Sequence, residues 1–125
     1  MAGEVKLGDF GFAVQLTKQK TSLKDLMGTP EYMAPELINE EGYGTGVDIW
    51  SFGIFCMELA NGELPYVDIE DPKEVLTHLK KGPPKLEDKK WSPAFKDFVS
   101  KCLVIDPLKR HTAKQLLIHE FLIGA

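Results

Sequence analysis

The stretch 48–60, with the sequence DIWSFGIFCMELA, is the part of the chain that decides the fold. Nine of its thirteen residues are apolar, and at 100° per residue they surround the helix axis instead of forming one stripe. A helix that is hydrophobic all round is a buried helix. The stretch is too short to cross a bilayer, which takes about 20 residues. We therefore expect a core helix, about 20 Å long, that other elements enclose on every side.

Polar residues mark both ends of this predicted helix. Asp48 lies where its carboxylate can accept hydrogen bonds from the free N–H groups of the first turn. Asn61 and Gly62 supply the turn that ends the helix, because glycine readily adopts a left-handed conformation. The aromatic side chains of the stretch are expected in the core, and not on a platform that stacks bases: Trp50, Phe52 and Phe55.

Length, charge and cysteine content narrow the class of protein. A chain of 125 residues is long enough for one domain, and a net charge of −4 argues against general binding to nucleic acid or to anionic membranes. Cys56 and Cys102 lie in apolar stretches, which favours buried, reduced thiols, with a disulfide or a reactive thiol as the alternatives. Met1 leads directly into a charged segment, so we expect no signal peptide and a cytoplasmic location.

The other elements follow from local patterns. Residues 4–7 alternate polar and apolar side chains, which predicts a short, half-buried strand. Residues 15–27 are mostly polar and read as a loop, and loops of that length are usually functional or disordered. A short helical turn is expected at 35–39, and a glycine-rich connection at 42–46 leads into the core helix.

Three later helices are predicted from their first residues and their apolar spacing. Asp71 and Glu74 form a predicted N-cap and capping box, Ser92 opens the next helix, and Thr112 with Gln115 caps the last one. The middle helix has the strongest periodicity, with apolar residues at i, i+3, i+4, i+7 and i+8: Phe95, Phe98, Val99, Cys102 and Leu103. The expected fold class is mainly α, a helical bundle around a buried central helix with a short β remnant at the N-terminus.

Asp9 is the acid that is best placed to bind a metal ion. It lies between the strand-like segment and Gly11, which lets the chain turn sharply, and Mg²⁺ is usually bound by one carboxylate together with substrate phosphates. An isolated Asp-Phe-Gly tripeptide is common by chance, so its setting matters. Four motifs occur in order along the chain: Asp9-Phe10-Gly11, Ala34-Pro35-Glu36, DIWSFG at 48–53, and Arg110 after Asp106-Pro107.

Together these motifs resemble the C-terminal part of a serine/threonine protein kinase domain, over essentially the whole chain. Thr29, in Gly28-Thr29-Pro30, is similar to the substrate-docking threonine of such kinases. The run DFGFAVQLT at 9–17 resembles the PAK-like branch, which small GTPases switch on, although Glu31-Tyr32 replaces the Tyr-Trp pair usual there. The resemblance implies a partial kinase domain over 1–125, with the DFG strand and activation segment at 4–36 and a helical subdomain at 37–123.

The resemblance also implies roles for individual residues. Asp9, Phe10 and Gly11 would form the cofactor site for ATP and Mg²⁺, with Asp9 ligating the metal and Phe10 packing into the core. Glu36 and Arg110 would form a buried ion pair, and Asp48 would hold backbone amides of a catalytic loop or act as a plain helix cap. A groove for protein substrates with Ser or Thr acceptors would be formed by Met27, Gly28, Thr29, Pro30 and Glu31.

The activation loop departs from the PAK-like pattern at one position. Asp25 stands where PAK-like kinases carry a phosphorylated threonine, three residues before the glycine of Gly-Thr-Pro. A carboxylate has one negative charge and two acceptor oxygens, so Asp25 could act as a permanent, weaker substitute for phosphate. The alternative is an ordinary solvated loop acid. Thr21 and Ser22 are further candidate phosphorylation sites.

Several kinase parts do not occur in these 125 residues. The sequence has no Gly-rich loop, no lysine-bearing strand and no His-Arg-Asp catalytic loop. We therefore expect part of an ATP-dependent serine/threonine kinase of intracellular signalling, with an isolated chain that does not catalyse. A small GTPase would act through regions outside the chain, and no nucleic acid or membrane partner is expected. The alternative is a non-catalytic kinase-fold module that binds substrates or partners.

The core helix has a further consequence. In kinases a long preceding helix covers it, and that helix is not part of this sequence. Each large apolar side chain left uncovered forfeits about 1.5–3 kcal/mol of burial. We therefore expect marginal folding and an exposed apolar patch that binds the dye ANS.

Overall fold

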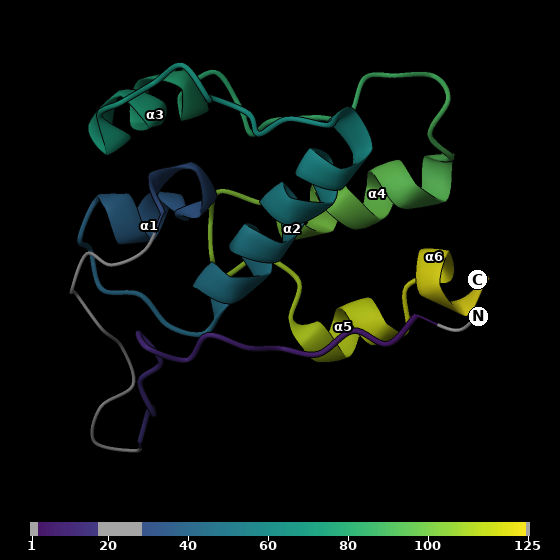
Figure 1. The fold of residues 1–125 in the computed structure, drawn as a ribbon, viewed down its shortest axis with the longest axis horizontal. Helices are drawn as coiled ribbons and strands as arrows, with labels where there is room; N and C mark the ends of the chain where they lie inside the picture. Colours follow the sequence, from purple (N-terminus) through teal and green to yellow (C-terminus); the bar gives the residue numbers. More distant parts are fainter. Residues whose placement is uncertain (1–2, 18–28, 125) are drawn as a thin grey trace.

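The computed structural model describes residues 3–17 and 29–124, and within them the chain is mainly helical (Figure 1). This confirms the predicted class. The helical segments are η1 (Pro30–Tyr32), α1 (Pro35–Ile38), α2 (Gly46–Asn61), α3 (Pro72–Leu79), α4 (Pro93–Cys102), α5 (Ala113–Leu117) and α6 (Glu120–Ile123).

Helix α2 is the centre of the fold (Figure 1). It packs against α4 and η1, while α1 packs on α3 and α6 packs on α4 and α5. The helix begins at Gly46, two residues before the predicted start. It ends as predicted, because Gly62 adopts a φ of 80° and its N–H donates to the carbonyl of Glu58 at 2.8 Å.

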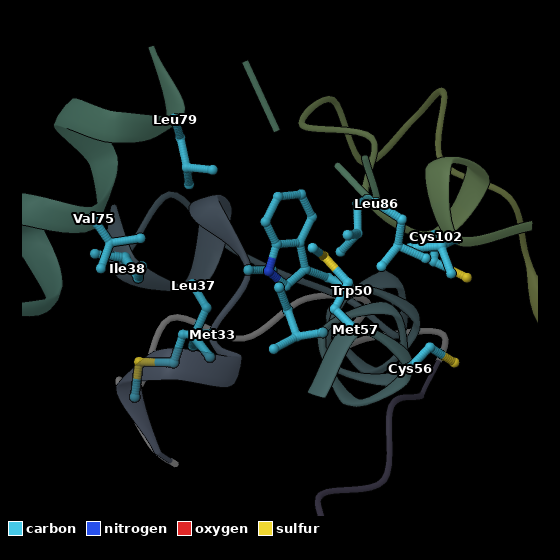
Figure 2. Close-up of a cluster of buried hydrophobic side chains, with 14 of the residues drawn as sticks. Met33, Leu37, Ile38, Trp50, Cys56, Met57, Val75, Leu79, Leu86 and Cys102 are labelled. Carbon is cyan, nitrogen blue, oxygen red and sulfur yellow. The ribbon is translucent and has the colours of Figure 1, made fainter. Parts of the chain in front are cut away.

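One side of α2 forms the core. The Trp50 and Ile54 side chains are each only 1% exposed, and Figure 2 shows the Trp50 indole amid apolar side chains from several segments of the chain. Gly53 allows the close approach of α4, because a Cβ added there would lie 2.7 Å from Cys102 Cβ and 2.8 Å from Leu103 Cδ2. The α2–α4 contact therefore has no room for a side chain at position 53.

The opposite side of α2 is open. Phe52 and Phe55 are 44% and 45% exposed, and Leu59 is 69% exposed. The expectation that Phe52 and Phe55 lie in the core is wrong, as is full enclosure of the helix, because the described residues supply no element that covers this side. The exposed apolar patch expected for an uncovered core helix is present.

The predicted helix starts are largely confirmed. The Asp71 carboxylate accepts from the Lys73 N–H at 3.0 Å, and Ser92 Oγ accepts from the Phe95 N–H at 3.1 Å. Thr112 and Gln115 form a complete capping box. The box predicted with Glu74 is not formed, since Asp71 bonds one residue earlier, to Lys73.

The last predicted helix is interrupted. The structure divides it into α5 and α6, because the backbone leaves the helical path at Ile118 and His119 starts a new helix. His119 Nδ1 accepts from the Phe121 N–H at 3.0 Å and so acts as the N-cap of α6.

The strand predicted at residues 4–7 is not formed. Val5 and Leu7 are 95% and 88% exposed, and the segment has no regular secondary structure. A strand needs a partner to satisfy its backbone groups, and the described residues offer none to this segment.

Both cysteines are free and buried, as predicted. Burial raises the pKa of the Cys56 thiol to about 11 and that of Cys102 to about 12. The thiols therefore stay protonated and unreactive at neutral pH. No helix in the described part of the chain is long and apolar enough to span a membrane.

Candidate functional site

The Glu36–Arg110 ion pair is the most deeply buried charged pair among the residues that the structure describes. Arg110 Nη1 lies 2.7 Å from Glu36 Oε1, and Nη2 lies 3.1 Å from Glu36 Oε2. Both residues are buried, at 6% and 5% exposure. The pair is therefore bidentate and shielded from water, which is the geometry in which Arg and a carboxylate interact most strongly.

The remaining donors of Arg110 are also satisfied. Nε donates to the carbonyl of Val104 at 2.9 Å, Nη1 to that of Gly46 at 2.8 Å, and Nη2 to that of Ile105 at 3.3 Å. The guanidinium carbon lies 5.3 Å from the centre of the Trp50 ring. All five N–H donors of the side chain are thus paired, so Arg110 joins α1, the start of α2 and the loop after α4.

A second contact fixes the segment 29–33 on α2. The Tyr32 hydroxyl donates to Glu58 Oε2, and Ser51 Oγ donates to the carbonyl of Tyr32 at 2.8 Å. The hydrogen bond to Glu58 is the main reason that the pKa of Tyr32 rises to about 12. The described members of the predicted substrate groove, Thr29, Pro30 and Glu31, directly precede Tyr32, whose N–H donates to the carbonyl of Thr29 at 3.0 Å.

Asp9 lies in an open part of the structure. Its φ is 57°, a left-handed conformation that aspartate tolerates better than most residues, and a turn at Gly11 follows it. The Asp9 side chain lines a groove of about 530 Å³ whose other wall is the open side of α2, with Asp48, Phe52 and Phe55. Phe10 is 66% exposed, so the expectation that it packs into the core is wrong for this chain.

The residues around Asp9 fit one mode of metal binding. The described residues hold no cluster of three or more side chains that could bind a metal ion between them. A single exposed carboxylate beside an open groove suits Mg²⁺ that takes its other ligands from phosphates and water.

Asp48 does not act as a cap in the structure. Helix α2 has Thr45 at its N-cap position, without a side-chain bond, and Asp48 lies in the first turn. There its negative charge is favourable to the helix dipole. Asp48 is exposed, and it lines both the Asp9 groove and a groove of about 490 Å³ that residues 12–14 and 16 also line.

Several predicted site residues lie outside the described part of the chain. These are the activation-loop candidates Thr21, Ser22 and Asp25 and the groove residues Met27 and Gly28.

Two contacts were missed by sequence reasoning. One is the bond between Tyr32 and Glu58. One indication of it was present in the sequence, because Glu58 is the only acid besides Asp48 in the apolar stretch 48–60. His119 Nε2 lies 2.7 Å from Asp97 Oδ2, and this bond is the main cause that lowers the pKa of Asp97. Nothing in the spacing of Asp97 and His119 indicated that contact.

Fold and motifs together define the class of this protein. The chain matches the protein kinase domain family over residues 1–122, and it belongs to that family.

Similarity to two relatives further identifies the chain as one of PAK-like type. It is 48% identical over 121 residues to serine/threonine-protein kinase pakC of Dictyostelium discoideum, which covers 96% of this chain and 25% of pakC. It is 50% identical over 121 residues to pakB of the same organism, covering 96% of this chain and 14% of pakB. The chain therefore spans about a quarter of one relative and about a seventh of the other.

Proposed function

We propose that this chain is the activation-segment and helical part of an ATP-dependent serine/threonine protein kinase. The observation that carries the proposal is the buried, bidentate Glu36–Arg110 pair. It joins the end of the segment 4–36 to the helical region 37–123, while Asp9 stays open to the groove beside α2. A rigid anchor at one end of a segment and an open carboxylate at the other suit a site that positions a phosphate donor against a protein substrate.

Each part of the chain has a distinct task in this proposal. Asp9 would hold Mg²⁺, and the metal would supply positive charge to offset the negative charge that develops during phosphoryl transfer. Tyr32 and Ser51 keep the segment 29–33 seated on α2, so that Thr29 can bond to catalytic-loop groups. Glu36 and Arg110 hold the end of the segment. Asp48 would hold the backbone of a catalytic loop supplied from outside this sequence.

The wider setting of the chain is part of the same proposal. The substrates would be intracellular proteins with Ser or Thr acceptors, and the location would be cytoplasmic. A small GTPase would act through regions that these 125 residues do not include. The support for this is the PAK-like type of the sequence.

The isolated chain should not transfer phosphate. Phosphoryl transfer depends on positioning and charge stabilisation, and this sequence holds no catalytic-loop Asp and no phosphate-binding Lys strand. We expect no phosphorylation of a generic acceptor by the purified 125-residue polypeptide. Turnover that survives removal of contaminating kinases would contradict this.

A chimera tests the proposal directly. The 125 residues replace the matching segment of pakC, and kinase activity is measured with ATP, Mg²⁺ and a Ser/Thr peptide. We expect an active chimera that Asp9→Asn inactivates by at least about 100-fold, while Asp88→Asn, in an exposed loop, leaves the rate unchanged. A folded but inactive chimera would instead support the alternative, a non-catalytic module that binds substrates or partners.

The same chimera tests Asp25. If its carboxylate replaces a phosphate, Asp25→Asn lowers the rate and Asp25→Glu retains most of it. An unchanged rate in Asp25→Asn would show that Asp25 is an ordinary loop acid.

A further inference from the structure

A separate groove, far along the chain from Asp9, is lined by α4 and by residues 83–86 of the connection that leads into α4 from α3. Figure 1 shows the course of that connection between the two helices. It encloses about 450 Å³ and shares no residue with the Asp9 groove. Its floor is apolar, because Leu86, Val99 and Leu103 are at most 8% exposed. The floor is thus part of the core, and the groove is large enough to seat one large apolar side chain above it.

The connection that borders this groove has an unusual backbone. Residues 82–88 have no helix or strand, and Pro83 and Pro84 lack an N–H group. In the described part of the chain, no backbone hydrogen bond joins residues 83–87 to another residue. An irregular segment with unpaired N–H and C=O groups can bond to a second extended chain laid alongside it.

The charge around the groove is opposite to that of the whole protein. Residues 80–96 contain six lysines and two acids, in a chain whose net charge is −4. Lys85 and Lys96 line the groove, and neither forms an ion pair with a described residue. The one acid that lines it, Asp97, is already bonded to His119 and lies 3.7 Å from the ammonium of Lys101.

From these three observations we infer that the groove between residues 83–86 and α4 binds an extended acidic peptide segment of a partner protein. One large apolar side chain of the peptide sits over Leu86, Val99 and Leu103. Acidic residues on either side of it face Lys85 and Lys96. The peptide backbone runs beside residues 83–87 and uses their free N–H and C=O groups.

An apolar floor separates this surface from a general polyanion site. Nucleic acids and anionic membranes are attracted by clustered lysines alone, whereas the groove adds a pocket that only an apolar side chain fills. Peptide binding at this groove does not require kinase activity, so the binding experiment is independent of the result obtained with the chimera.

Binding is measured by fluorescence anisotropy with the 125-residue chain. The probe is a fluorescein-labelled nonapeptide of Asp and Glu with one central Phe. The first control peptide carries Ala at the centre, and the second carries Lys in place of every acid. We expect saturable binding of the acidic Phe peptide, at least about tenfold weaker binding of the Ala peptide because the burial of one Phe is lost, and none of the Lys peptide.

Variants locate the site. Lys85→Glu with Lys96→Glu should weaken binding of the acidic Phe peptide by at least about tenfold, and Ser100→Trp should do so by filling the groove without a change of charge. The matched control, Lys6→Glu with Lys114→Glu, makes the same charge change at exposed positions elsewhere and should bind within about twofold of the original chain. Circular dichroism confirms that each variant keeps its helices.

Three results would overturn the inference. The first is no saturable binding of the acidic Phe peptide. The second is equal loss in the Lys6/Lys114 control, which would mean that net charge alone attracts the peptide. The third is equal binding of the Phe and Ala peptides, together with competition by phosphatidylserine vesicles, which would make the lysines a general polyanion surface.

Discussion

The two sides of α2 differ more than any other pair of regions in this molecule. The closed side holds Trp50 and Ile54 against the core and ends at the Glu36–Arg110 pair. The open side holds Phe52, Phe55 and Leu59 in partial contact with solvent, beside the loosely packed segment that carries Asp9. Both sides belong to one sixteen-residue helix of mostly apolar sequence.

The two sides of α2 differ in whether other residues of this chain cover them. On the closed side every side-chain donor of Arg110 has a partner within the chain, so the charge buried there is compensated by these residues. On the open side, apolar side chains and the Asp9 and Asp48 carboxylates share one groove. One side of α2 is thus packed against the rest of the chain and the other side is exposed, which agrees with the proposal that the chain is part of a larger kinase.

On the closed side, the largest loss of folding stability is expected for a substitution of Arg110. Arg110→Met leaves the Glu36 carboxylate buried without a partner, and we expect the free energy of unfolding to fall by about 3–5 kcal/mol. Urea unfolding followed by circular dichroism measures this. Lys101→Met, which removes only an exposed pair with Asp97, should cost less than about 1 kcal/mol. Adding Glu36→Leu to Arg110→Met should restore part of the loss, and no restoration would contradict the assignment to a buried charge.

A smaller effect is expected at the α2–α4 contact. Gly53→Ala places a methyl group 2.7 Å from Cys102 Cβ, and overpacking of this kind typically costs about 1–3 kcal/mol. The better helix propensity of alanine offsets up to about 1 kcal/mol of that. The thermal midpoint should fall for Gly53→Ala and stay unchanged for Gly3→Ala, where a Cβ meets no atom within 4 Å. A Gly53→Ala chain more stable than the original would show that α4 can move away.

The open side should be the least sensitive to substitution. Phe55→Gln with Leu59→Gln changes two exposed side chains one turn apart, and the free energy of unfolding should move by no more than about 0.5 kcal/mol per site. ANS fluorescence should fall because the apolar patch is interrupted. Leu108→Gln, an equally apolar but isolated exposed position, should leave ANS binding unchanged. A large loss of stability in the double variant would mean that this side is packed in solution.

Most of the fold could be predicted from local signals in the sequence. The N-caps at Asp71, Ser92 and Thr112 and the stop at Gly62 depend on residues within a few positions of each other, and they are present. Features that depend on contacts between distant segments of the chain could not be predicted from local signals. The strand at 4–7 required a partner strand, and the choice of which side of α2 is buried required the positions of α1 and α4.

The candidate site shows the same division. Asp9, Glu36 and Arg110 were found through motifs, and the contact between the last two is present. Their roles in a kinase stay proposals. The bond between Tyr32 and Glu58 joins residues 26 apart, and no motif contains both. The exposure of Phe10 also escaped prediction, because a motif specifies a residue type and not what surrounds it.

The ion pair also sets an order of events during synthesis. Glu36 and Arg110 are separated by 74 positions, so the carboxylate leaves the ribosome long before the guanidinium that neutralises it. Until then, burying α1 would enclose an uncompensated charge, and the nascent helices should remain open or be held by chaperones. A contact of such long range makes the final docking of α1 a late step of folding, however early its helical turn forms.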